Sequence, residues 1–191
     1  MTDHLTFSGK LYAFIKNSVS SFLRIFINPL LALKSGCLIH PLAFISGDVR
    51  IGKGAMVAKS KVVAYEGTIK IGEKTEIFGG CQIHAHADVK IGSWVIMAGE
   101  CAIVTTKHLF EDADKKIKEQ GQVYCGVTIE DDVWLGFRVT VLPGAKIGKG
   151  SVIGAGAVVA GEIPPMSVAV GVPAKVIRKR GDQNSGGEIP G

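Results

Sequence analysis

Residues 147–158 read Ile-Gly-Lys-Gly-Ser-Val-Ile-Gly-Ala-Gly-Ala-Val, two successive copies of one six-residue unit. Each copy has an aliphatic residue, a glycine, two variable residues, a small residue and one further residue, and the unit recurs at 51–56 and 71–76. A period of six fits neither the 3.6-residue period of a helix nor simple strand alternation. It fits a solenoid of short strands that each point one aliphatic side chain inward and must stack to bury it.

Three such strands make one triangular coil, so the predicted inward positions give a little under six coils. The steps from 63 to 71 and from 83 to 91 are longer by two residues, which predicts corner insertions. A β-sandwich with coincidental spacing is the alternative, but the period persists over more than a hundred residues. The predicted fold is an all-β parallel β-helix of about six coils, with inward positions 39, 45, 51, 57, 63, 71, 77, 83, 91, 97, 103, 129, 135, 141, 147, 153 and 159.

The composition of the 191-residue chain fits one such domain, with 25 glycines and few aromatic residues. Its four cysteines lack metal-ligand spacing, so we expect reduced thiols, a cytoplasmic protein and no metal. No signal peptide is visible, and Arg24, Asn28 and Pro29 interrupt the longest apolar stretch, so we expect no membrane span.

The net charge is +5, and four basic residues gather between 175 and 180. A nucleic-acid interface would combine a basic stripe with stacking aromatics, and none is visible, so we expect no nucleic-acid partner. A localised basic end is better matched to a small phosphorylated ligand, with a solvated terminus as the alternative. The four residues are Lys175, Arg178, Lys179 and Arg180.

Four segments are predicted along the chain. Residues 1–35 hold an amphipathic helix (8–28) and a linker, and this helix either packs on the β-helix or lies on the inner face of the membrane. The β-helix domain spans 36–165 and is interrupted by one long polar loop at about 108–126. A C-terminal segment follows at 166–180, and 181–191 is expected to be a disordered tail.

Five short motifs after the loop add to the repeat: Val133-Trp134-Leu135-Gly136, Pro143-Gly144-Ala145-Lys146-Ile147-Gly148, Val152-Ile153-Gly154-Ala155-Gly156, Ile163-Pro164-Pro165 and Gly171-Val172-Pro173-Ala174-Lys175-Val176-Ile177. With these motifs, roughly residues 36–180 resemble the hexapeptide-repeat acetyltransferases, and 106–178 resemble their galactoside, maltose and polysaccharide O-acetyltransferase branch. The resemblance implies a left-handed β-helix, a homotrimer, and acetyl transfer from acetyl-CoA to a sugar hydroxyl, plausible in surface polysaccharide biosynthesis.

His108 opens the long loop, and from its position alone an ordinary surface histidine is a better interpretation than a general base. The resemblance implies the general base, which takes the proton of the acceptor hydroxyl, with a backbone amide near Gly136-Phe137 at the oxyanion. It also implies a CoA groove between subunits. The implied CoA-binding residues are Ala98, Trp134, Phe137, Ala155 and Ala160 for pantetheine and Lys175 and Arg178 for the phosphates.

His84 and His86 fall one coil before His108, and are predicted either to contact the acceptor, with an auxiliary base role, or to be outward polar residues of the coil. Three other functions stay open. An amino-sugar N-acetyltransferase would use the same groove. A γ-class carbonic anhydrase would need three convergent histidines, with two of them five residues apart, and no such pair is present. A non-catalytic scaffold would bind no CoA.

Overall fold

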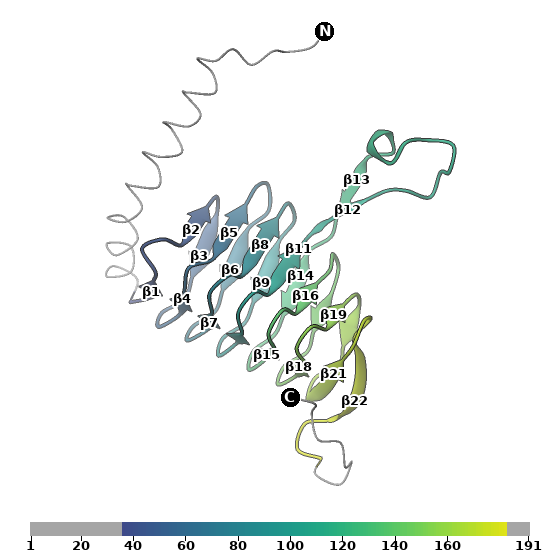
Figure 1. Ribbon diagram of the computed structural model, residues 1–191. Coiled ribbons are helices and arrows are strands. Elements are labelled where there is room, and N and C mark those ends of the chain that lie inside the picture. The colour runs from purple at the N-terminus through teal and green to yellow at the C-terminus, as the bar shows by residue number, and fades with distance from the viewer. Residues whose placement is uncertain (1–35, 183–191) are drawn as a thin grey trace, which may run out of the picture.

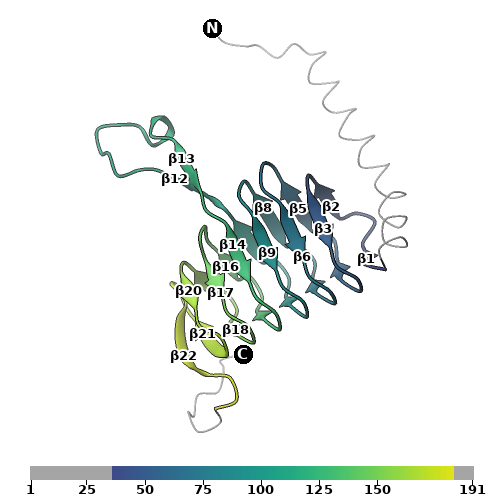
Figure 2. The ribbon, with the colours of Figure 1, turned by 180° about the vertical axis from the view of Figure 1, so that it is seen from behind.

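A computed structural model describes residues 36–182 as a stack of short strands wound into a prism with three faces (Figure 1). The reverse view shows the same stack with its hairpin projecting from one edge (Figure 2). The predicted helix at 8–28 and most of the predicted tail lie outside the described residues. Within the described range, no helix is long and apolar enough to cross a membrane.

The strands of the coils form three sheets, named here A, B and C, one for each face. Sheet A holds β1 (Leu38–Ile39), β4 (Met56–Val57), β7 (Glu76–Ile77), β10 (Ile96–Met97), β15 (Trp134–Leu135), β18 (Val152–Ile153), β21 (Ser167–Val170) and β22 (Lys175–Lys179). Sheet B holds β2 (Phe44–Ser46), β5 (Lys61–Ala64), β8 (Gln82–Ala85), β11 (Ala102–Val104), β16 (Thr140–Val141) and β19 (Val158–Val159). Sheet C holds β3 (Val49–Ile51), β6 (Ile69–Ile71), β9 (Val89–Ile91), β14 (Val127–Ile129), β17 (Lys146–Ile147) and β20 (Glu162–Ile163).

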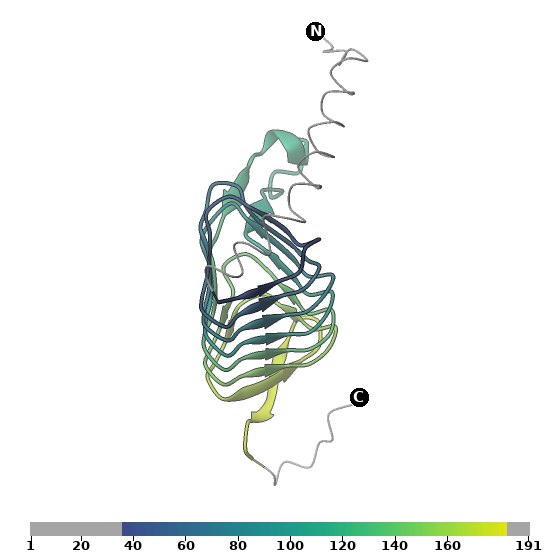
Figure 3. The ribbon, with the colours of Figure 1, turned by 90° about the vertical axis from the view of Figure 1, so that its left-hand side faces the viewer.

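Each strand pairs in parallel with the equivalent strand one coil away, which confirms the predicted β-helix. The described stack reaches about seven turns, because β21 adds a parallel strand to sheet A beyond the six in sheets B and C. The solenoid therefore continues past Pro165, and β22 closes its end by turning back antiparallel to β21. Figure 3 shows the coils following one another around a common core.

The inward side chains form that core and are fully buried in the middle of the stack, as at Ile83 and Ile103. One predicted inward position is wrong. Val62, rather than Val63, lies in register with Ile45 and Ile83 and is 0% exposed. The turn before β5 is one residue shorter than a regular step, which the repeat pattern did not reveal.

The connections from sheet B to sheet C, called the B/C edge, carry nearly all of the variation in coil length. The inward residues across this edge lie nine positions apart from Val62 to Ile71 and eight from Ile83 to Ile91. Across the other edges the step is six residues, apart from the short turn before β5. There the corners are tight, because a Cβ on Gly72 would lie 2.4 Å from the backbone of Gly92.

The longest connection at the B/C edge is the predicted loop, and it is an ordered hairpin. Strands β12 (Thr106–His108) and β13 (Gln122–Tyr124) pair antiparallel, and a 3₁₀ turn at Ile117–Glu119 lies near the tip. The hairpin projects away from the coils (Figures 1 and 2). The projection begins at Thr106, so His108 belongs to the stem of the hairpin and lies outside the coil.

Candidate active site

The predicted site residues fall on two different edges of the prism. The B/C edge carries His108, on the hairpin, and Ala160, with His84 and His86 at the end of β8 and in the turn after it. The A/B edge, made by the connections from sheet A to sheet B, carries Ala98, Phe137 and Ala155, with Trp134 beside it on β15. Lys175 and Arg178 lie on β22 of sheet A. Sheet B separates the two groups within one chain.

His108 is exposed on β12 and is paired across the hairpin with Gln122. Directly cross-strand residues share one face of a ribbon, and so do residues two positions apart along a strand. The Thr106–Tyr124 pair lies next but one to the His108–Gln122 pair, so His108 and Tyr124 project from the same face. Within residues 36–182, no hydrogen bond or ion pair engages the His108 imidazole, so the ring is accessible to a substrate.

His86 lies in the middle of a stack of three rings. Its imidazole is 4.5 Å from the Tyr65 ring on one side, at 8° between planes, and 5.2 Å from the Tyr124 ring on the other, at 11°. Tyr65 comes from the preceding coil and Tyr124 from the root of the hairpin. The Nδ1 atom of His86 is buried and has no hydrogen-bond partner among the described residues.

His84 lies beside this stack and is held by polar contacts. Its Nδ1 is 3.2 Å from the Tyr65 hydroxyl, and its Nε2 is 3.3 Å from Oε1 of Gln82. Burial lowers the pKa of His84 below 6.5, and the positive charges of Lys61 and His86 lower it further. His84 is therefore kept neutral more readily than an ordinary histidine.

The buried residue Thr105 fixes the turn that holds these histidines. Its Oγ1 accepts hydrogen bonds from the backbone amides of His86, at 2.8 Å, and Ala87, at 3.1 Å, and donates one to the carbonyl of His84 at 3.3 Å. The carbonyl of Thr105 also accepts the amide of Cys125 at 2.8 Å. One threonine thus joins the histidine turn to the root of the hairpin.

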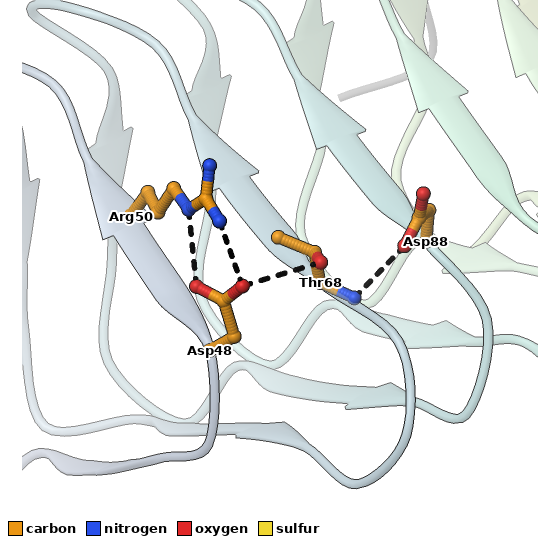
Figure 4. Close-up of polar contacts among 4 residues, drawn as sticks. All are labelled: Asp48, Arg50, Thr68 and Asp88. Carbon is orange, nitrogen blue, oxygen red and sulfur yellow. Dashed lines mark hydrogen bonds and ion pairs between the residues drawn. The ribbon is translucent and has the colours of Figure 1, made fainter.

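The same edge is reinforced closer to the start of the stack by a ladder of polar side chains (Figure 4). Thr68 donates its amide to Asp88 at 2.9 Å and its hydroxyl to Asp48 at 3.5 Å, and Arg50 binds Asp48 through two nitrogens. The hydrogen bond from Arg50 lowers the pKa of Asp48. These contacts pair the long turns of adjacent coils, so the edge is ordered despite its irregular length.

On sheet A, Trp134 faces outward and is 47% exposed. Its strand register continues through Val152 and Val168 to Arg178, so these four residues lie on one line across the sheet. At the A/B edge, the Phe137 ring lies against Gly99, and Arg138 lies 5.0 Å from the centre of that ring. Ala98, Gly99 and Ala155 are small residues at this edge.

The basic residues at the C-terminal end are engaged to different degrees. Arg180 binds Asp132 at 2.8 Å, and Lys179 donates to the Pro165 carbonyl and the Ser167 hydroxyl. Arg178 contacts only the adjacent carbonyl of Lys179, and no ion pair is recorded for Lys175 in the described chain. Of these four basic residues, Lys175 and Arg178 are consequently the two whose charged groups are available to an anionic ligand.

The two backbone amides predicted to stabilise the oxyanion, those of Gly136 and Phe137, differ in whether they already donate a hydrogen bond. The Gly136 amide donates to the carbonyl of Ile153 at 2.8 Å as part of the coil-to-coil ladder, so it is already engaged. No intramolecular hydrogen bond is recorded for the Phe137 amide in the described range. Between the two predicted candidates, Phe137 therefore offers the available N–H.

Between residues 36 and 182, no three His, Cys, Asp or Glu side chains are grouped to hold a metal ion. The four cysteines are free thiols, three of them buried. The hydrogen bond with Cys81, together with burial, raises the pKa of Cys101, so this thiol stays protonated. The three buried cysteines, Cys37, Cys81 and Cys101, thus occupy small-residue positions of the coil.

The sequence did not single out Tyr65, Tyr124 or Thr105. Tyr65 was hidden in a coil of irregular length, and Tyr124 lies in the loop, for which the repeat gives no register. The one available signal was that Tyr65 and His86 lie about one coil apart. The predicted roles of the seven CoA-binding residues, of His84, His86 and of His108 stay predictions.

Several known proteins are similar to this chain in sequence and in fold. A family model described as bacterial transferase hexapeptide (six repeats) matches residues 126–161. A probable acetyltransferase of Mycobacterium tuberculosis, Rv3034c, is 38% identical over 149 residues, covering 78% of this chain and 49% of its own length. The galactoside O-acetyltransferase of Escherichia coli K12 is 34% identical over 135 residues, covering 70% of this chain and 65% of its own length.

Among solved structures, a maltose O-acetyltransferase from Clostridium difficile 630 is 31% identical with a TM-score of 0.55, and the match covers 71% of this chain and 68% of that one. The chain spans only about half to two thirds of the curated relatives it matches. The repeat, the parallel coils and these similarities agree on one conclusion: the chain belongs to the hexapeptide-repeat acetyltransferase family, and it is similar in sequence to galactoside and maltose O-acetyltransferases.

Proposed function

We propose that the protein transfers an acetyl group from acetyl-CoA to a hydroxyl of a sugar, and that this sugar belongs to a surface polysaccharide or its precursor. The galactoside and maltose O-acetyltransferases that it resembles support a sugar acceptor. The exposed position of His108 on a projecting stem leaves room for a sugar within a longer chain. The free cysteines support a cytoplasmic location, with residues 8–28 as the proposed contact with the inner membrane face or the β-helix.

The separation of the site residues onto two edges carries this proposal. The candidate base is on the B/C edge, whereas the exposed tryptophan, the small residues and Arg178 are on the A/B edge and sheet A. The three-residue strand β11 alone extends about 10 Å between those edges. We propose a homotrimer in which the B/C edge of one subunit meets the A/B edge of the next, so that each groove combines both sets. Ala160 would then face the ligand from the base side.

In the proposed reaction, His108 accepts the proton of the acceptor hydroxyl, and the oxygen attacks the carbonyl carbon of the acetyl thioester. The Phe137 amide donates a hydrogen bond to the oxyanion, a contact typically worth about 3 kcal/mol in the transition state. The C–S bond then breaks, the acetyl ester forms, and the thiolate of CoA takes the proton from His108. The phosphates of CoA lie at Lys175 and Arg178.

Thermal unfolding with and without millimolar CoA or acetyl-CoA is the first test. A ligand at about a hundred times its dissociation constant adds about 2.7 kcal/mol to the unfolding free energy, so the midpoint should rise. A panel of sugars is then screened by thiol release, with each hydroxy sugar paired to its 2-amino counterpart. Transfer to amino sugars alone would replace the O-acetyltransferase proposal with N-acetylation, and no shift with either CoA compound would reject both.

Co-expression of two inactive variants tests the shared groove. His108→Ala removes the base from the B/C edge, and Trp134→Ala alters the A/B side, so mixed trimers contain some grooves with both sides intact. We expect the co-expressed pair to recover activity that neither variant has alone. If each chain held a complete site, mixing would restore nothing.

A further inference from the structure

We infer that His86 and Tyr124 are positioning residues, whose ring contact sets the angle of the hairpin and thereby the place of His108. This inference rests on the proposed function for its kinetic test. It assigns His86 a role different from acceptor contact or auxiliary base. The argument uses the root of the hairpin, the ring stack and the face on which His108 lies.

Among residues 36–182, backbone hydrogen bonds join the hairpin to the coils only at its root. Cys125 donates its amide to Thr105, and Val127 donates to Asp88 at 3.0 Å. Beyond the root, the recorded backbone hydrogen bonds of the stem join its own strands, ending with Leu109 to Gly121 at 3.1 Å. A two-stranded ribbon held at one end can tilt, so its angle needs a further contact.

The Tyr124–His86 stack supplies that contact. It is the one ring contact in the described chain that links the hairpin to the coils, and its planes differ by 11°. His86 is fixed in position, because the Tyr65 ring packs on its other face and the Thr105 hydroxyl accepts a hydrogen bond from its backbone amide. The stem of the hairpin therefore packs against the His86 ring, whose opposite face is packed against Tyr65.

The burial of Nδ1 indicates that the His86 side chain acts through ring stacking and not through hydrogen bonding. A histidine that contacts a substrate or moves protons presents its ring nitrogens to a partner. Nδ1 of His86 instead lies buried without one among the described groups. The flat faces of the ring make the recorded contacts, so an aromatic ring without nitrogen should replace it.

A substitution at Tyr124 should shift the position of His108, because both side chains lie on one face of the stem and their positions along it differ by two residues. General-base catalysis needs the nitrogen within about 3.2 Å of the proton donor, and a misplacement of about 1 Å can cost about a hundredfold in rate. A tilted stem would therefore lower turnover without touching CoA.

Steady-state kinetics of the trimer with acetyl-CoA and the acceptor found in the sugar screen test this inference. We expect His86→Ala and Tyr124→Ala each to lower kcat by about 10- to 100-fold with KM for acetyl-CoA unchanged. His86→Phe and Tyr124→Phe should recover most of the loss. The double alanine variant should be no worse than either single one, because both remove one contact. If His86→Phe is as impaired as His86→Ala, the nitrogens matter and the inference is wrong.

Amide hydrogen exchange gives a readout that needs no activity. His86→Ala should accelerate exchange in peptides covering 105–125, His86→Phe should return it to the wild-type rate, and peptides of the central coils should not change. Equal exchange in all three proteins would overturn the inference even if turnover falls. A wild-type protein that binds no CoA and acetylates no sugar would reject the proposed function, while the exchange result would still decide the role of the stack.

Discussion

Arg178 lies three strands from Trp134 in sheet A, on the same outward-facing line. At the usual strand spacing this separation is about 14 Å. An exposed aromatic ring at one end of this line and a cation at the other match an extended ligand with an apolar arm and an anionic head. The line therefore gives the proposed CoA site a direction along the axis of the prism.

Removing the cations from this line should weaken CoA binding selectively. We expect Lys175→Ala and Arg178→Ala each to raise the dissociation constant for CoA about tenfold, or about 1.4 kcal/mol. The value of kcat at saturating acetyl-CoA should not change, because neither residue lies near the reacting atoms. Isothermal titration at two salt concentrations measures the effect, which should shrink as salt screens the phosphates.

Lys70→Ala is the matched control, because Lys70 is exposed on sheet C, away from the proposed groove. A similar loss of affinity in this variant would mean that net charge, and not the position of the cations, governs CoA binding.

His108→Ala should lower kcat by about 10²- to 10⁴-fold, which is the usual contribution of a general base. Its affinity for CoA should match wild type, because the proposed CoA contacts come from Trp134, Lys175 and Arg178 and not from His108. Single-turnover thiol release measures the rate and titration measures the affinity. The neighbouring variant Lys107→Ala changes an exposed side chain on the other face of the stem and serves as control. Weaker CoA binding with unchanged turnover would refute the assignment of His108 as the base.

The pKa of His84 should make stability fall in mildly acidic solution. Because the folded-state pKa lies below 6.5, the unfolded chain binds a proton more readily than the native one as the pH drops through that region. Stability is therefore fully present above the ordinary value and decreases below it. Urea unfolding at pH 7.5 and pH 5.5 should show a smaller difference for His84→Gln than for wild type.

A direct measurement is available from the His84 ring proton in a magnetic-resonance titration, whose midpoint should lie below 6.5. Lys61→Gln should move this midpoint upward, since the charge of Lys61 contributes to the lowering. A midpoint above the ordinary histidine value would contradict both the burial and the charge contributions.

Core truncations should cost most in the middle of the stack. Ile103→Ala removes a fully buried side chain between two coils and should lower the unfolding free energy by about 2–5 kcal/mol. Ile45→Ala makes the same change at the first coil, where the side chain is only partly buried, and should cost less. Denaturant unfolding of both variants measures the two losses of unfolding free energy. Equal losses would mean that a further segment covers the first coil.

The coil architecture was predictable because one aliphatic residue per strand has to face inward, and sixteen of the seventeen predicted inward positions do so. The exception, Val63 for Val62, arose where a turn one residue short precedes a turn three residues longer than a regular step, and only their net excess of two residues shows in the spacing. Only a paired neighbour such as Ile83 fixes the register there, and pairing between coils is a property of the folded chain.

The candidate site was less predictable, for a physical reason. Motifs and resemblance pointed to His108 and Trp134, but the contact between His86 and Tyr124 joins a regular coil to a loop without a repeat. Their separation in sequence carries no period, so nothing in the sequence brought the two rings together. Likewise, the engagement of the Gly136 amide depends on the neighbouring Ile153 carbonyl.

The concentration of length changes at the B/C edge has an evolutionary consequence. Insertions there leave the strand ladder and the inward residues in place, as the hairpin between β11 and β14 demonstrates. Selection can thus lengthen, shorten or replace the segment proposed to contact the acceptor without changing the residues that stabilise the fold. Folding and the proposed acceptor contact lie in different segments of this architecture, which makes 109–121, beyond His108 and Tyr124, the natural segment to exchange when a new acceptor specificity is sought.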